Sequence, residues 1–119
     1  MDKAIVLVVE DEPLIRMNAA LMVEEAGYAV IEATNADEAI RILEERNDIN
    51  VVFTDVNMPG SMDGLKLAHA IHGRWPPIRV IVTSGQVAVR ESDIREDDRF
   101  IAKPYDARQI ANMLHDIAA

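Results

Sequence analysis

The 119-residue sequence predicts an α/β fold, a doubly wound sheet of five parallel strands in the order 2-1-3-4-5. Five short runs rich in Val and Ile alternate with helix-like stretches, which implies a parallel sheet with helices on both sides. The first, third and fourth runs are continuous rather than alternating, as in strands buried on both faces. Right-handed crossovers make such a sheet doubly wound, and the five-stranded order fits one domain spanning residues 1–119.

The five strands are expected at short apolar runs bounded by turn or helix signals. In chain order they are Ala4–Val9, Tyr28–Glu32, Val51–Thr54, Val80–Ser84 and Phe100–Ala102.

Two helices are expected between the first three strands. Pro13 is tolerated in a first helical turn, and Gly27 follows that stretch as a stop signal. Asn35 with Glu38 three residues later predicts the start of the second helix. The apolar stripe of that helix is Ala36, Ala39, Ile40 and Leu43.

Three further helices follow. One spans Gly64 to Ile71 and is ended by Gly73 and the turn Trp75-Pro76-Pro77, and a weakly patterned one is expected around Val87 to Arg95. The last begins at Asp106, with Gln109 three residues on. Its apolar face consists of Ile110, Leu114 and Ile117.

Composition excludes several classes of protein. The chain has no cysteine, so disulfides and cysteine metal sites are excluded and a reducing compartment fits. A net charge of −9 argues against binding a nucleic-acid backbone. No secretory signal is visible, and the longest apolar run, Ala4 to Val9, is too short to cross a bilayer. We expect a cytoplasmic protein with no nucleic-acid or membrane partner.

Polar side chains follow four of the predicted strands. Carboxyl ends of parallel strands meet at one edge of the sheet, and ligands bind where the strand order reverses, here between the first and third strands. The residues that should converge there are Glu10-Asp11, Asp55, Thr83-Ser84 and Lys103-Pro104.

Three carboxylates and one lysine at one edge predict a cation site. The carboxylates repel one another; Lys103 offsets one negative charge and a divalent cation would offset two. Oxygen ligands without His or Cys favour Mg²⁺, with Mn²⁺ possible. A carboxylate beside a metal and a lysine is a suitable nucleophile for phosphoryl transfer, and the Thr83 hydroxyl can donate to a transferring oxygen. No Gly-Lys-Ser/Thr loop is present, so a nucleoside triphosphate donor is not expected.

These pieces resemble the response-regulator receiver family of two-component signalling. The resemblance runs the whole length of the chain and implies the flavodoxin-like receiver fold. The segments on which the resemblance rests are Val9-Glu10-Asp11-Glu12, Thr54-Asp55-Val56-Asn57-Met58-Pro59, Asp63-Gly64, Val82-Thr83-Ser84 and Lys103-Pro104-Tyr105.

The resemblance implies a role for each site residue. Asp55 would be the phosphoacceptor and would bind Mg²⁺ directly together with Asp11, while Glu10 would lie nearby or act through water. The backbone carbonyl of Asn57 would add a ligand. Lys103 would pair with the phosphoryl oxygens, and its peptide bond to proline is expected to be cis.

The resemblance also implies a switch and partners. Thr83 would move toward the phosphoryl group and Phe100 would rotate inward, biasing a bistable element. The input would be a histidine kinase or a histidine phosphotransfer protein. The output would be a protein contact on the face formed by the helix around Val87, the strand at Phe100 and the last helix.

The sequence departs from the common family pattern at three places. Three residues, Gly60-Ser61-Met62, separate Pro59 from Asp63 where two are usual, as in receivers attached to some sensor kinases. Glu10 replaces the commoner Asp and reaches one methylene further. Gly85, two residues after Thr83, offers no side chain to shield the phosphoryl group.

Two other functions remain open from the sequence. An aspartyl-phosphate phosphatase usually carries an acid two residues after its nucleophile, where this chain has Asn57. The second is a constitutive scaffold that is not phosphorylated. As a receiver, the chain is expected to catalyse only its own phosphorylation and dephosphorylation and not to be an enzyme otherwise.

The remaining expectations concern packing. They place His69, His72 and His115 at the surface, Met17, Met22 and Met113 in the core, and Trp75 in a packed loop.

Overall fold

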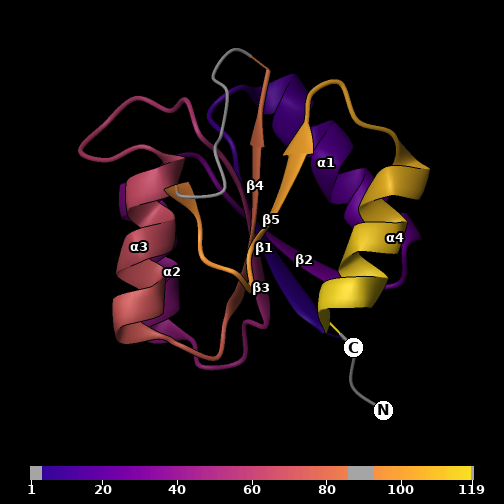
Figure 1. The fold of residues 1–119 in the computed structure, drawn as a ribbon. Coiled ribbons are helices and arrows are strands. Elements are labelled where there is room, and N and C mark those ends of the chain that lie inside the picture. Colours follow the sequence, from indigo (N-terminus) through magenta and orange to yellow (C-terminus); the bar gives the residue numbers. More distant parts are fainter. Residues whose placement is uncertain (1–3, 86–92, 119) are drawn as a thin grey trace.

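The computed structural model, which describes residues 4–85 and 93–118, has three layers (Figure 1). A five-stranded parallel sheet in the order β2-β1-β3-β4-β5 lies between two pairs of helices, which confirms the predicted fold class. The strands are β1 (Ile5–Val9), β2 (Ala29–Ala33), β3 (Val51–Asp55), β4 (Arg79–Ser84) and β5 (Arg99–Ala102). The helices are α1 (Pro13–Glu25), α2 (Ala36–Glu45), α3 (Gly64–Arg74) and α4 (Ala107–Ala118).

The sheet separates two apolar cores. On one face α2 and α3 cover side chains such as Leu7 and Val52, and on the other α1 and α4 cover Val8 and Phe53. Alternate residues of β1 and β3 therefore enter opposite cores, which is why these strands read as continuous apolar runs. The predicted face of the last helix, Ile110, Leu114 and Ile117, is buried in the second core.

Capping side chains fix where the helices begin. Glu38 N donates to Asn35 Oδ1 at 2.8 Å at the start of α2. At the start of α4 the bonds are reciprocal, since Gln109 N donates to Asp106 Oδ1 at 2.8 Å and Asp106 N donates to Gln109 Oε1 at 2.9 Å. Both predicted helix starts are confirmed.

The turn from β1 into α1 is built from its own local bonds. Pro13 is the first residue of α1, and Ile15 N donates to Glu12 Oε2 at 2.8 Å. The cap is therefore Glu12, which leaves the side chains of Glu10 and Asp11 for other contacts. Gly27 ends the helix with φ +103°, as its position in the sequence predicts.

Other expectations are corrected or lie outside the described residues. Met17 is wrong as a core residue, because it is 50% exposed on α1. His72 is wrong as a surface residue: its side chain is 9% exposed and contacts Asp98 Oδ2 at 2.8 Å. His69 and His115 are exposed, while Met22, Met113 and Trp75 are partly buried against the two cores. The helix expected around Val87 falls mostly on residues 86–92, outside the described residues, so the label α4 belongs to the last helix.

None of the helices in the described part of the chain has the length and apolar character that a membrane span requires.

Candidate functional site

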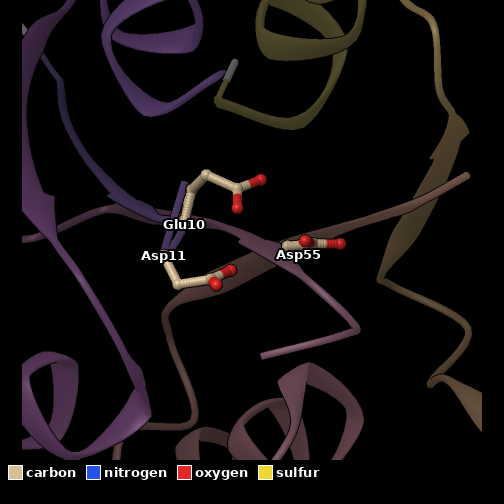
Figure 2. Close-up of side chains that lie close together, drawn as sticks. All are labelled: Glu10, Asp11 and Asp55. Carbon is tan, nitrogen blue, oxygen red and sulfur yellow. The ribbon is translucent and has the colours of Figure 1, made fainter. Parts of the chain in front are cut away.

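Three carboxylates gather at the carboxyl ends of β1 and β3. One oxygen each of Glu10, Asp11 and Asp55 lies within 4.8 Å of the others, and Figure 2 shows the three side chains close together. Glu10 and Asp55 are buried, with 4% and 6% exposure, whereas Asp11 is exposed. The strand order brings them together, because β1 and β3 are neighbours in the sheet although 41 residues lie between Val9 at the end of β1 and Val51 at the start of β3.

Lys103, immediately after β5, contacts two of these carboxylates. Its Nζ donates to Glu10 Oε1 at 3.0 Å and to Asp55 Oδ2 at 3.2 Å. Two backbone features hold the lysine: its N–H donates to Ser84 O at 3.1 Å, and the bond to Pro104 is cis, as expected. A Cβ at Gly85 would lie 3.3 Å from Lys103 Cβ, so the glycine leaves room for the lysine stem.

The charges at this edge change the affinity of their groups for protons. Burial raises the pKa of Glu10, and the charge of Asp55 adds to this, against hydrogen bonds from Glu12 N–H and Lys103. For Lys103, burial lowers the pKa, but the hydrogen bond to Glu10 and the charge of Asp55 outweigh burial and raise it. The lysine therefore stays protonated, and the cluster still carries more negative than positive charge.

The donor set fits a hard divalent cation. The three clustered side chains offer carboxylate oxygens within 4.8 Å of one another, and ligands of one Mg²⁺ ion lie about 3.0 Å apart when neighbouring and about 4.2 Å apart when opposite, so the side chains would draw inward around the ion. Both Glu10 oxygens already accept hydrogen bonds, one from Lys103 Nζ and one from Glu12 N at 3.1 Å. Contact through water therefore suits Glu10, and Asp11 and Asp55 suit direct contact.

The first turn of α3 lies against the end of β3. Gly64 N donates to Val56 O at 2.9 Å, and a Cβ on Gly64 would lie 2.0 Å from the carbonyl oxygen of Asp55. Only glycine permits this approach. The sequence suggested Gly64 as a family marker and a helix start, but the contact with the backbone of Asp55 could be found only in three dimensions.

Thr83 lies beside Asp55 in the sheet. The two residues are register partners, and Val56 N donates to Thr83 O at 2.9 Å. Thr83 is 1% exposed, and its Oγ1 has no hydrogen-bond partner within the described residues. A buried hydroxyl without a hydrogen-bond partner is uncommon in folded proteins.

The other predicted site residues lie further out. Asn57 is exposed in the loop after β3, and Phe100 is partly exposed on the edge strand β5, where it pairs with Val82. The spacer at residues 60–62 of this loop contacts α2, since Ser61 Oγ donates to Asp37 Oδ1 at 2.5 Å. Gly60 supplies the positive φ of +108° that the turn requires.

Sequence comparison agrees with this geometry. The family model described as response regulator receiver domain matches residues 6–115. This chain belongs to the response-regulator receiver family. Its members are signalling modules of two-component systems that accept a phosphoryl group on an aspartate.

The relatives that this chain resembles include bacterial receivers. It is 33% identical over 118 residues to the sensor kinase CckA of Brucella abortus, covering 96% of this chain and 12% of the kinase. It is 35% identical over 108 residues to the aerobic respiration control protein ArcA of Escherichia coli K12, covering 88% of this chain and 44% of ArcA. The crystal structure of the receiver domain from hybrid histidine kinase CckA superposes with a TM-score of 0.83 at 31% identity, covering 98% of this chain and 100% of that domain. The chain thus spans less than half the length of these two curated relatives.

The raised pKa of Glu10 predicts a pH-dependent difference between wild type and Glu10→Gln in EDTA. A raised pKa in the folded state means that the acid favours folding below its ordinary value of 4.5 and loses this contribution as the pH rises through the folded pKa. As the pH rises above about 4.5, the variant should therefore gain stability relative to wild type until Glu10 is fully ionised in the folded state. Chemical denaturation across this range measures the difference. An Asp48→Asn control, at an exposed carboxylate paired with Arg46, should not reproduce that trend; a relative loss for Glu10→Gln would contradict the prediction.

Proposed function

We propose that this receiver takes a phosphoryl group onto Asp55 from a histidine-phosphorylated kinase or phosphotransfer protein, in a Mg²⁺-dependent reaction. The observation that carries the proposal is the contact of Lys103 Nζ with Asp55 Oδ2 beside a cluster of three carboxylates. A nucleophilic carboxylate, a fixed ammonium and a set of oxygen ligands are the parts that phosphoryl transfer to an aspartate requires.

In the proposed reaction an Asp55 oxygen forms a bond to phosphorus while the bond from phosphorus to the donor's imidazole nitrogen breaks. Mg²⁺, held by Asp11, Asp55 and the Asn57 carbonyl, would supply positive charge next to the phosphoryl oxygens. Lys103 donates to one of those oxygens, because its Nζ is already 3.2 Å from the acceptor carboxylate. The Thr83 hydroxyl donates to another, which gives this buried group the acceptor that the described residues do not provide.

The output in this proposal is a protein contact controlled by phosphorylation. Movement of Thr83 on β4 would be followed by inward rotation of Phe100, which is partly exposed on the adjacent strand β5. The affected face would include β5 and α4, together with the helix that the sequence predicts around Val87, which falls mostly outside the described residues. Nucleic-acid binding has no part in the proposal, since the net charge is −9. A cytoplasmic location and the assignment of residues 1–119 to one receiver module stay predictions.

The deciding experiment is intact-mass measurement after incubation with Mg²⁺ and acetyl phosphate, on wild type and Asp55→Asn. We expect one base-labile phosphoryl adduct on wild type and none on the variant, which keeps the shape of the side chain and loses its nucleophilic charge. An adduct on both proteins would show that a residue other than Asp55 accepts the phosphoryl group. Absence of both the adduct and Mg²⁺ binding in wild type would favour the constitutive scaffold, and turnover of small phosphate esters would favour the phosphatase.

The exposed face of α1 suits the donor protein. All four large apolar residues that are strongly exposed in the described part of the chain lie on it: Leu14, Ile15, Met17 and Leu21. Three of them have the helical spacing of a packing stripe. The face continues into an apolar cavity of about 360 Å³, which is lined by Ile15, Met22 and Tyr105 and reaches Lys103. A donor helix on this face would therefore lie beside the acceptor edge of the sheet.

Leu14→Gln with Leu21→Gln tests this docking face. Both side chains are about half or more exposed, so the double variant should fold with stability within about 0.5 kcal/mol per site of wild type. Transfer from a histidine-phosphorylated protein that is active on wild type should slow by about tenfold or more, while the rate with acetyl phosphate stays unchanged. Rapid-quench measurement of both rates checks it. An equal loss with both donors would show a damaged site rather than a docking face.

A further inference from the structure

We propose that Arg16 is the positioning residue for the cation site, because it fixes the peptide between Glu10 and Asp11. The inference rests on the proposed Mg²⁺ site and assigns a role to a residue that no sequence motif singles out. Arg16 lies in the first turns of α1, on the same face of the sheet as the second core, and its side chain is 18% exposed.

The guanidinium of Arg16 joins the ends of two strands. Its Nη1 donates to the backbone carbonyl of Glu10 at 3.0 Å, and its Nε donates to Glu32 Oε1 at 3.2 Å. Glu32 lies on β2 and is the register partner of Val8. A planar guanidinium can hold both acceptors in a fixed relative position, whereas a lysine ammonium has no such fork.

The Glu10 carbonyl belongs to the peptide that places Asp11. The hydrogen bonds between β1 and β2 end at this point. Glu10 N still donates to Ala33 O at 3.1 Å, but the carbonyl oxygen of Glu10 accepts from Arg16 and not from a strand. The side chain of Glu10 is held separately, by Lys103 and by Glu12 N–H. The exposed Asp11 carboxylate has no such enclosure, so its position depends on the orientation of its backbone.

Positioning and simple electrostatics predict opposite results at this residue. Arg16 is a cation near three carboxylates, so removing its charge should strengthen Mg²⁺ binding if charge alone matters. If Arg16 acts by fixing the peptide, removing it should weaken binding, because Asp11 is then no longer held in a ligating position. Groups that orient metal ligands typically contribute about 10–100-fold in metal affinity.

The experiment is calorimetric titration of Mg²⁺ into wild type, Arg16→Gln and Arg16→Lys at constant ionic strength. We expect Arg16→Gln to raise the Kd about tenfold or more. Arg16→Lys keeps the charge but loses the fork, and we expect it to raise the Kd by a smaller factor, where charge alone predicts no change. With acetyl phosphate, the Mg²⁺ concentration for half-maximal rate should rise by the same factor, while the rate at saturating Mg²⁺ should change by less than about twofold.

Arg46→Gln is the matched control, because Arg46 is an exposed arginine paired with Asp48 at the C-terminal end of α2, away from the carboxyl ends of the strands. It makes the same charge change and should leave the Kd near that of wild type. Unchanged or tighter binding by Arg16→Gln would overturn the inference, as would an equal change in Arg46→Gln. If Arg16→Gln fails to fold in EDTA, Arg16→Lys decides. Absence of Mg²⁺ binding in wild type would instead defeat the proposed function on which the inference rests.

Discussion

Gly64→Ala should lower the free energy of unfolding by about 3 kcal/mol or more. The added Cβ would lie 2.0 Å from Asp55 O, 2.8 Å from Asp55 C and 2.9 Å from Val56 Cα. All three atoms are backbone, so no side chain can rotate away, and either α3 or the end of β3 must move. Since that strand end carries Asp55, phosphorylation should fall together with stability. Urea denaturation and the acetyl phosphate assay measure the two effects.

Gly73→Ala is the control in the same helix. A Cβ at Gly73 would meet nothing within 4 Å, so this substitution should be neutral or should stabilise the protein by about 0.5–1 kcal/mol through helix propensity. The contrast separates the cost of the close approach from the general effect of replacing a helical glycine. A Gly64→Ala protein as stable as Gly73→Ala would contradict the close approach of α3 to the end of β3.

Local rules predicted the elements of this fold. The capping pairs at Asn35 and Asp106, the proline at the start of α1 and the stop at Gly27 depend on residues within a few positions of one another. The candidate site followed from one further rule, that parallel strands present their carboxyl ends at one edge. That rule predicts that Glu10, Asp55 and Lys103, which are far apart in the sequence, lie close together. In the structure Lys103 contacts both carboxylates.

Contacts between elements could not be predicted in the same way. The pattern of α1 does not show that Met17 faces outward, because half-apolar helices can be turned by small amounts on a sheet. The bond between His72 and Asp98 joins α3 to the segment before β5, and the bond from Arg16 to Glu10 O is made to a backbone atom. Neither leaves a signal in residue type or spacing. The close approach of Gly64 to Asp55 likewise depends on how α3 is placed on the sheet.

Lys103→Met should separate Mg²⁺ binding from phosphoryl transfer. Methionine keeps an unbranched stem of similar length and removes the ammonium that contacts Glu10 and Asp55. Without that positive charge the carboxylates attract a cation more strongly, so Mg²⁺ should bind at least as tightly as in wild type. The transferring oxygens lose a fixed donor, and phosphorylation by acetyl phosphate at saturating Mg²⁺ should fall about 10²-fold.

The same variant should be less stable than wild type in EDTA, because two largely buried carboxylates then face each other without their counter-charge. Removing one partner from a fully buried ion pair costs about 3–5 kcal/mol, and Lys103, at 20% side-chain exposure, should cost less, about 1–3 kcal/mol. Saturating Mg²⁺ should recover much of that stability but not the rate of phosphorylation. Lys66→Met, at an exposed lysine of α3, should change neither quantity. A normal phosphorylation rate in Lys103→Met would show that Lys103 does not assist the reaction and serves only to balance the charge of the acidic cluster in the folded protein.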